Sequence, residues 1–379
     1  MTLLQRLRER FHGSLRFKLL AVALLPLVIA LPLLIVLLAV WGNLYYDRLL
    51  IAKVRSDLAV AHGYFEQVKE GIGRRVEALA GSERLARTLR ERPQAASVLL
   101  RDAQATLGVD FLILLDADGR VRAASGASAT GLGYESPLAL RPSGHAVTEV
   151  DLLGAGQLAA IDPRLAEKAR TPLLKTQNAL PTQQTEEPRG MAIQTLAPVP
   201  GGGLLVGGLL LNRNLDFVDR LNEIVYPEGA LPLGSAGTAT LFLDDVRIAT
   251  NVRLFEGERA IGTRVSAVVR HAVLDQGRTW LDRAFVVNDW YVSAYEPIAD
   301  GRGKRIGMLY VGYLEAPFLR VGYLALAATV LLFLAAAAAA TYVSLRLARH
   351  VSRPVEQMHG VMSAIEAGAE EARVGRIVG

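Results

Sequence analysis

The sequence predicts an α+β fold in which a long helix and two tandem antiparallel sheet modules lie between two membrane-spanning helices. Three observations support this prediction. The run Val321–Leu345 contains neither a charged residue nor a proline. Apolar residues recur at helical spacing from Leu50 to Leu79. Between these two segments, the order strand, Asp-containing turn, strand occurs twice.

The apolar run 321–345 is long enough to cross a membrane. At about 1.5 Å rise per residue it reaches roughly 37 Å, and the hydrocarbon core of a bilayer is about 30 Å thick. A second apolar run, Leu19–Trp41, lies near the N-terminus. It exceeds the roughly 7–15 apolar residues of a cleavable secretory signal, which favours an uncleaved anchor. We therefore expect transmembrane helices over 19–43 and 318–345.

The net charge of +5 is concentrated at the two ends of the chain. Residues 1–18 form a basic tail, and Arg346, Arg349 and Arg353 follow the second apolar run. Basic residues favour the cytoplasmic flanks of membrane helices. This predicts a two-pass protein of the bacterial inner membrane, in contact with lipid, with both termini cytoplasmic and residues 44–317 outside. The charge does not form a nucleic-acid-binding patch, so no nucleic-acid partner is expected.

The segment 44–107 is predicted to be a stalk of largely helical structure. The apolar stripe from Leu50 to Leu79 advances in steps of three and four, which marks one face of a helix. This stripe either covers a sheet or pairs with its twin in a homodimer, and the two interpretations are compatible along different lengths. Gly81-Ser82 predicts a helix stop and a new N-cap, and Arg92-Pro93 predicts a further break.

Two segments of the chain repeat the same order of predicted strands. We interpret this order as an internal duplication of one α/β module, with copies at 108–228 and 229–317, although two hairpins of independent origin would look similar. The first copy is longer, and we place its insertion in the polar stretch 154–190. The predicted strands are Phe111–Leu115, Val121–Ala124, Met191–Pro198 and Leu204–Leu211 in the first copy, and Thr238–Leu243, Val246–Thr250, Trp290–Ile298 and Arg305–Leu314 in the second.

This arrangement resembles the double Cache sensors, the extracytoplasmic domains of bacterial chemoreceptors, sensor histidine kinases and cyclic-dinucleotide enzymes. The most specific segments are NVRLFEGERAIGTRVS, GRTWLDRAFVVNDWYVSAYEPI and RIGMLYVGYLE, all within 251–315. The resemblance covers residues 44–317 in outline and 238–315 in detail. It implies two tandem PAS-like Cache modules, membrane-distal and then membrane-proximal, in which one face of the sheet holds a small ligand, often in the distal module.

Residues 346–379 resemble the start of a HAMP linker. Val355, Met358, Met362 and Ile365 occupy the a and d positions of two heptads. A HAMP unit needs a second helix, so we expect a cytoplasmic output module beyond residue 379. A histidine kinase is the leading interpretation, and a chemotaxis signalling tip or a cyclase are the alternatives.

The sequence contains no recognisable catalytic motif. Cysteine is absent, which excludes disulfides, thiolate metal sites and a thiol nucleophile. There is no GxSxG elbow, HExxH motif or P-loop, and the six histidines lack metal-ligand spacing. The glycine-rich segment Pro200–Gly208 lies between two strands and is read as a hairpin turn. We therefore expect no enzymatic activity, cofactor or metal in this segment. The kind of functional site that we still expect is a ligand-binding pocket.

Candidate ligand-binding residues cluster in the second copy. Arginine offers a planar fork that suits a carboxylate, and aromatic walls exclude water around it. Strand alternation places Tyr291, Ser293 and Tyr295 on one face, and Trp290 and Val292 on the other. In the alternative interpretation, the aromatic residues are core and the arginines form salt bridges. The candidates are Arg264, Trp280, Arg283, Phe285, Tyr291 and Tyr295.

The first copy offers weaker candidates, which the resemblance to double Cache receptors favours. They are Arg122 and Arg189, followed by Arg141, His145, Lys175 and Asn178. The leading hypothesis is a homodimeric transmembrane receptor for a small extracytoplasmic carboxylate or amino acid. Ligand would then act through the second membrane helix on the HAMP bundle. The alternatives are a dimerising ectodomain without ligand and a membrane-tethered enzyme.

Overall fold

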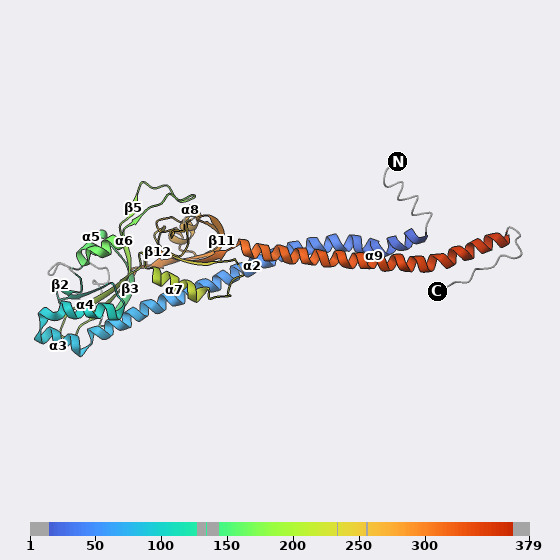
Figure 1. The fold of residues 1–379 in the computed structure, drawn as a ribbon. Helices are drawn as coiled ribbons and strands as arrows, with labels where there is room; N and C mark the ends of the chain where they lie inside the picture. Colours follow the sequence, from blue (N-terminus) through green and yellow to red (C-terminus); the bar gives the residue numbers. More distant parts are fainter. Residues whose placement is uncertain (1–14, 127–133, 135–143, 233, 255–256, 367–379) are drawn as a thin grey trace. The chain divides into compact units, whose positions relative to one another are not determined.

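The computed structural model describes residues 15–126, 134, 144–232, 234–254 and 257–366. The chain divides into two units, one of Leu49–Phe318 and the other of Met1–Arg48 with Leu319–Gly379. The helices are α2 (Leu15–Ala80), α3 (Glu83–Glu91), η1 (Pro93–Ala95), α4 (Ala96–Leu107), α5 (Ala155–Ile161), α6 (Pro163–Ala169), α7 (Leu215–Val225), α8 (Ala267–Arg270), η2 (His271–Asp275) and α9 (Ala316–Glu366) (Figure 1).

The apolar stripe of α2 is buried within the unit Leu49–Phe318. Leu50, Val54, Phe65 and Val76 are each at most 5% exposed. The phenol of Tyr313 donates a hydrogen bond to the Leu50 carbonyl oxygen at 2.9 Å. The sheet-covering interpretation of the stripe is therefore confirmed at these positions.

The breaks after α2 follow local sequence signals. Ser82 caps α3, because its side-chain oxygen accepts a hydrogen bond from the Leu85 amide at 3.2 Å. Pro93 lacks the backbone N–H that the interior of a helix requires, and it begins the short η1. Both predicted helix boundaries are confirmed.

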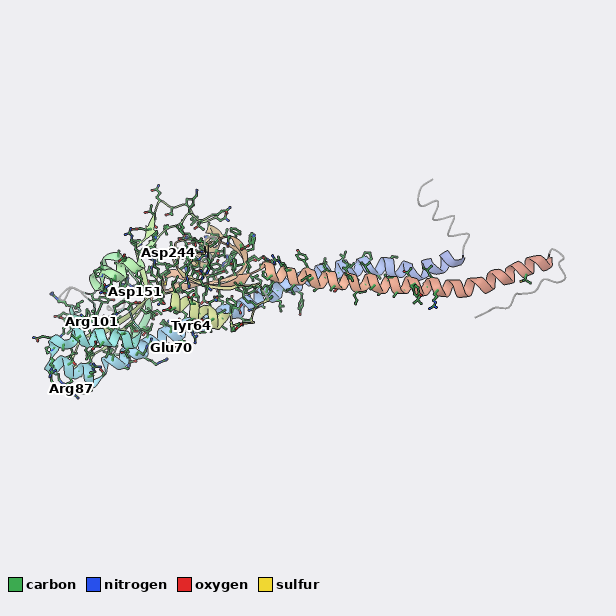
Figure 2. All side chains as sticks on the ribbon, in the orientation of Figure 1. Tyr64, Glu70, Arg87, Arg101, Asp151 and Asp244 are labelled. Carbon is green, nitrogen blue, oxygen red and sulfur yellow. The ribbon has the colours of Figure 1, made fainter. Side chains whose placement is uncertain are left out.

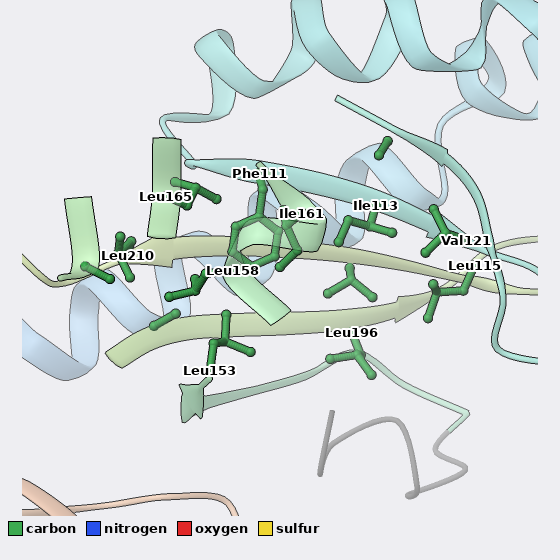
Figure 3. Close-up of a cluster of buried hydrophobic side chains, with 14 residues drawn as sticks. Phe111, Ile113, Leu115, Val121, Leu153, Leu158, Ile161, Leu165, Leu196 and Leu210 are labelled. Atoms are coloured by element: carbon green, nitrogen blue, oxygen red, sulfur yellow. The ribbon is translucent and has the colours of Figure 1, made fainter. Parts of the chain in front are cut away.

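The first sheet has five antiparallel strands in the order β2-β1-β7-β6-β3. One face carries an apolar core in which Phe111, Ile113 and Leu115 of β1 meet Leu158 and Leu165 of the covering helices (Figure 3). The five strands are β1 (Phe111–Leu115), β2 (Val121–Ala124), β3 (Val147–Leu153), β6 (Gly190–Pro198) and β7 (Leu204–Leu210).

The second sheet repeats the same strand order. Read from its opposite edge it is β9-β8-β12-β11-β10, so β8 and β9 take the places of β1 and β2. All eight strands predicted from the sequence are present, with ends shifted by one residue at most. The outer strands β3 and β10 were not predicted as strands. The five strands are β8 (Gly237–Leu243), β9 (Val246–Thr250), β10 (Trp280–Val286), β11 (Asp289–Ala299) and β12 (Arg305–Leu314).

The two sheets differ most between their third and fourth strands. In the second sheet only Val287 and Asn288 separate β10 from β11. In the first sheet, residues 154–189 separate β3 from β6 and form α5, α6 and the short pair β4 (Thr171–Pro172) and β5 (Glu186–Glu187). This segment coincides with the stretch 154–190 in which the sequence analysis expects an insertion, and the assignment of two tandem modules stays a prediction.

One helical segment has the length and composition of a membrane span. Within the described part of the chain, Ala316–Arg346 at the start of α9 has a mean hydropathy of 2.3. The expected first span, 19–43, falls in part on residues whose side chains are outside the described set. The two-pass topology therefore stays a prediction, as does the HAMP assignment, since residues 367–379 also lie outside the description.

Candidate functional site

A small cavity lies on one face of the second sheet. Its volume is ≈ 30 Å³, whereas a single water molecule needs about 10–15 Å³. The cavity therefore suits two or three waters or a solute of few atoms. Among the described residues, none of those that line it is acidic. The polar and aromatic side chains of its wall are Arg247, Arg264, Ser266, Phe285 and Tyr295, with Thr176 and Gln177 from the insertion.

The strand periodicity explains which side chains form this wall. Phe242, Tyr295 and Tyr310 come from three neighbouring strands and form one buried cluster on the cavity face. The Tyr295 and Tyr310 rings have centroids 4.6 Å apart. Burial raises the pKa of both phenols, so they are neutral at physiological pH. Of these three residues Tyr295 lines the cavity, so an uncharged phenol forms part of its wall.

Arg247 of β9 is the buried cation of this site. It is 3% exposed. Its Nη1 donates a hydrogen bond to the Thr263 hydroxyl, and its guanidinium lies 5.0 Å from the centroid of the Phe242 ring. Its Nε has no hydrogen-bond partner among the described residues. Burial lowers the pKa of Arg247, and no carboxylate of the described chain forms an ion pair with it.

The structure places the two arginines predicted from the sequence against protein carboxylates. Arg264 lines the cavity, but its Nε and Nη2 donate to the two carboxylate oxygens of Asp245, at 3.1 and 2.7 Å. Arg283 projects to Glu315, whose carboxylate accepts from its Nε. Arg283 is not among the residues that line the cavity. The alternative interpretation, in which these arginines form salt bridges, describes both contacts.

The predicted aromatic residues divide between the cavity face and the sheet edge. Tyr295 lines the cavity, and Tyr291 joins the same buried cluster, where burial raises its pKa to about 12. Phe285 lines the cavity but is 39% exposed and packs edge-on against Trp290, with ring centroids 5.8 Å apart. Trp280 packs against the cluster, outside the cavity wall.

The candidates of the first copy do not form one site. Arg122 of β2 is exposed. Arg189 binds the carboxylates of Glu187 and Asp244. Lys175 and Asn178 are exposed on the hairpin between β4 and β5, His145 is exposed as well, and Arg141 lies outside the described residues.

The first sheet carries a different buried polar set. The phenol of Tyr134 donates a hydrogen bond to Gln194 Oε1, and Gln194 Nε2 lies 3.4 Å from Asp151 Oδ2. Asp151 and Gln194 are both buried, and burial raises the pKa of Tyr134. These side chains form hydrogen bonds with one another, so we interpret them as a polar network of the core and not as a binding site.

The hairpin between β4 and β5 covers the cavity of the other sheet. The Leu174 amide donates to the Gly262 carbonyl oxygen at 2.9 Å, and the Arg264 amide donates to Thr176 Oγ1 at 2.9 Å. The Ala267 amide donates to the Asn178 carbonyl oxygen at 2.8 Å. Figure 1 shows this hairpin extending from β5 toward α8. Thr176 and Gln177 of this hairpin therefore line a cavity on the other sheet.

Sequence reasoning missed Arg247 and the hairpin for different reasons. Arg247 stands in a short strand where one charged residue is ordinarily solvent-exposed, and only the fold buries it. A usable signal was its place beside Asp244-Asp245 in a strand with otherwise apolar neighbours. The contacts of Thr176 and Gln177 are long-range, and no local pattern marks them.

Comparison with known proteins identifies the second sheet. Residues 209–322 match the family model described as Single cache domain 3. The chain therefore contains a Cache sensor domain, and its range includes α7 and all five strands of the second sheet. No curated protein matches the chain in sequence.

Several solved sensor domains resemble the chain at low similarity. The periplasmic domain of Vibrio cholerae LuxQ is 11% identical with a TM-score of 0.39, and the alignment covers 69% of this chain and 98% of that one. The sensor domain of the V. cholerae histidine kinase DctB is 10% identical at a TM-score of 0.38, covering 70% and 97%. The ligand-binding domain of the Pseudomonas aeruginosa PAO1 amino-acid chemoreceptor PctB, in complex with L-Arg, is 14% identical at 0.31, covering 71% and 94%. These low scores carry no conclusion about the ligand or output of this chain.

Proposed function

We propose that the chain is a transmembrane receptor that senses a small extracytoplasmic solute. The observation that carries this proposal is the cavity of the Cache sensor domain, which is lined by a buried arginine without an acidic partner among the described residues. Charge-assisted hydrogen bonds to a guanidinium are strong and specific, so a carboxylate or an amino acid is the expected ligand class.

The repeated strand order supports two tandem Cache modules on this receptor. Both sheets have five strands in the same order. The first sheet differs from the second by the insertion 154–189 between β3 and β6. We assign the first sheet to the membrane-distal module and the second to the membrane-proximal module. The proximal module would then be the one that joins the membrane helix.

Signal transmission from this module has a short physical path. Strand β12 ends at Leu314 and α9 begins at Ala316, so Glu315 alone lies between the sheet and the helix. Glu315 is held by the Arg283 side chain, and its amide donates to the Trp290 carbonyl oxygen at 3.1 Å. A ligand that shifts β10 or β11 would therefore move the start of the membrane helix and, through it, the expected HAMP and output modules.

A solute screen on the full chain tests this function. The chain in lipid nanodiscs would be heated with a broad metabolite panel of organic acids, amino acids, sugars and amines. A solute that binds only the folded state raises the melting temperature, because its binding adds to the free energy of unfolding. Native mass spectrometry of the purified chain would look for a retained solute. A panel without any shift, together with no retained solute, would favour a dimerising ectodomain without ligand.

A further inference from the structure

Two large aromatic side chains are exposed together at one end of the second sheet. Phe285 of β10 is 39% exposed, and Trp290 of β11 is 54% exposed. The two residues are directly paired across the strands, and their rings pack edge-on. Together with the connecting turn, Val287 and Asn288, they form a surface that we call the aromatic tip. An exposed cluster of large apolar side chains is typical of an interaction surface.

The aromatic tip lies at the end of the sheet from which the apolar helix departs. Strand β12 ends at Leu314, which pairs with Tyr291, the residue after Trp290. The Trp290 carbonyl oxygen accepts a hydrogen bond from the amide of Glu315, and the apolar span Ala316–Arg346 begins at the next residue. Figure 1 shows β11 beside the start of α9. Trp290 is therefore one hydrogen bond away from the point at which the chain would enter a bilayer.

The length of helix before the uncharged run sets the height of the aromatic tip above the hydrocarbon core. This run begins at Val321, six residues after Glu315. At about 1.5 Å rise per residue, Glu315 lies about 9 Å along the helix from the edge of the core, and a tilted helix brings it closer. The headgroup layer on each side of the core is about 5–8 Å thick. The backbone of Trp290 is therefore beside the outer edge of this layer, and its side chain can reach into it.

We propose that the aromatic tip inserts into the headgroup layer on the extracytoplasmic side of the bilayer and binds phospholipid there. The inference rests on the transmembrane part of the proposed function and goes beyond it, because it gives the sensor domain a lipid-binding surface of its own. Tryptophan is enriched at membrane–water interfaces, where its ring packs against apolar atoms and its N–H stays near headgroups and water. Phe285 supplies a second apolar ring beside it.

The charges around the aromatic tip suit a phospholipid. Strand alternation places Arg283 on the same face of β10 as Phe285. Arg283 binds Glu315, but its side chain is 36% exposed, whereas that of Glu315 is 8% exposed. The cation of this ion pair therefore faces outward, and a headgroup phosphate can accept hydrogen bonds from a guanidinium. Asp289 precedes Trp290, so alternation directs its carboxylate to the other face of the sheet.

Fluorescence quenching of the full chain in phosphatidylcholine nanodiscs tests the position of the aromatic tip. The chain has three tryptophans, and Trp41→Phe together with Trp280→Phe leaves Trp290 as the only one. One quencher is a phospholipid that carries a nitroxide on its headgroup, and the other is iodide in the water. We expect the nitroxide lipid to quench the emission of Trp290 and iodide to quench it weakly, because headgroups surround the indole ring.

Two reference chains, in which all three tryptophans are replaced by phenylalanine, calibrate the quenchers. Val268→Trp reports on water, because Val268 is 64% exposed on α8, where the hairpin of the first sheet docks. Iodide should quench this chain, and the nitroxide lipid should not. Tyr323→Trp reports on the bilayer, because Tyr323 is 69% exposed within the span Ala316–Arg346. A lipid with a nitroxide on its acyl chain should quench it.

The matched variants, made in the chain that keeps Trp290, are Phe285→Asp and Val268→Asp. Both place a carboxylate at an exposed apolar position of the same domain. Phe285→Asp puts this charge beside the headgroup phosphates and removes an apolar ring, so we expect weaker quenching by the nitroxide lipid and stronger quenching by iodide. Val268→Asp should change neither. The measurement on Trp290 with its native neighbour Phe285 does not depend on these variants, so it still decides the question if one of them unfolds.

Each contrary result overturns a defined claim. Strong quenching of Trp290 by iodide and none by the nitroxide lipid, with Tyr323→Trp quenched from the acyl chains, overturns the inference and leaves the transmembrane receptor standing. Quenching of Trp290 by neither reagent overturns it in favour of a protein contact, such as one with a second copy of the chain. Lipid quenching that survives Phe285→Asp overturns the role of the aromatic pair. A Tyr323→Trp chain that acyl-chain nitroxide does not quench overturns the membrane span, and with it the transmembrane part of the proposed function.

Discussion

Nη2 of Arg189 lies 2.6 Å from Oδ2 of Asp244 and joins the two sheets. Arg189 directly precedes β6 of the first sheet, and Asp244 stands in the turn between β8 and β9 of the second. The next residue, Asp245, holds Arg264 beside the cavity. Figure 2 labels Asp244 at this position. Asp244 therefore binds Arg189 next to the first sheet, and its neighbour Asp245 binds Arg264 beside the cavity. The ion pair between the two sheets thus lies next to the proposed binding site.

The two partners of this ion pair should differ in their effect on stability. Asp244→Ala removes a side chain that is 41% exposed, so we expect a loss below about 1 kcal/mol. Arg189→Ala also leaves Glu187, whose side chain is 5% exposed, without its two hydrogen bonds from the guanidinium. We expect a loss of about 1–3 kcal/mol for this variant.

Urea unfolding of the unit that contains both sheets, followed by tryptophan fluorescence in the full chain, measures these differences. The variant Glu187→Gln with Arg189→Ala serves as control, because it removes the unpaired carboxylate together with its partner. This double variant should recover part of the loss. Equal losses for Arg189→Ala and Asp244→Ala would contradict the role given to Glu187.

Gly262 should be required for the hairpin to dock. Its φ is +84°, and a Cβ at this position would lie 2.1 Å from the Pro172 carbonyl oxygen. Gly303, in the turn between β11 and β12, has a φ of +81° with open space around it. Both Gly→Ala variants carry a left-handed backbone penalty of about 1–2 kcal/mol. Only Gly262→Ala also forces the hairpin away.

Limited trypsin digestion separates the two effects. Lys175 is exposed near the tip of the hairpin and offers a cleavage site. We expect Gly262→Ala to be cut there faster than the native chain, while Gly303→Ala is cut at the native rate despite a similar loss of stability. Identical digestion of the two variants would show that the hairpin is held by other contacts.

The sequence could predict the features that depend on neighbouring residues, but not those that depend on residues far apart in the chain. The eight predicted strands and the Ser82 cap depend on neighbours in sequence, on alternation and on turn residues. The partners of the arginines do not: Arg264 binds Asp245, 19 residues away, and Arg283 binds Glu315, 32 residues away. Residue type and spacing selected Arg264 and Arg283, but the fold determines which arginine is buried, and the Nε of that residue, Arg247, has no hydrogen-bond partner among the described residues.

If the chain forms a homodimer, exposed apolar positions of α2 should crosslink between the two protomers when they are replaced by cysteine. Leu50 and Val54 are buried against the sheet, so cysteines there would disturb the core without reporting on a partner. Leu49 and Val60 are 59% and 45% exposed. They are eleven residues apart, close to three helical turns, and so share one face. We expect cysteines at either position to crosslink two protomers under mild oxidation.

Arg55 provides the control, because it is exposed on a different face of the same helix. The chain has no native cysteine, so each variant reports one position. Crosslinking would be read from non-reducing gels of membranes at native expression levels. A product that forms equally at all three positions would indicate random collision and would leave the dimer without support.

The contact between α2 and the second sheet should depend on pH through Glu296. Its carboxylate lies 2.8 Å from Nδ1 of His62, and its side chain is 20% exposed. Burial raises the pKa of Glu296 above its ordinary value of 4.5, and the hydrogen bond with His62 opposes this only in part. In the unfolded chain the carboxyl group ionises near pH 4.5, so above this pH the folded state retains more protons.

The stability contributed by Glu296 is therefore fully present below pH 4.5 and is lost as the pH rises through the raised pKa. Glu296→Gln keeps the shape of the side chain and removes its ionisation. We expect the native chain to lose free energy of unfolding relative to this variant as the pH rises from about 4 to 7. Urea unfolding of both proteins at matched ionic strength measures the difference. If the difference is constant over this range, or grows in favour of the native chain as the pH rises, the raised pKa of Glu296 is wrong.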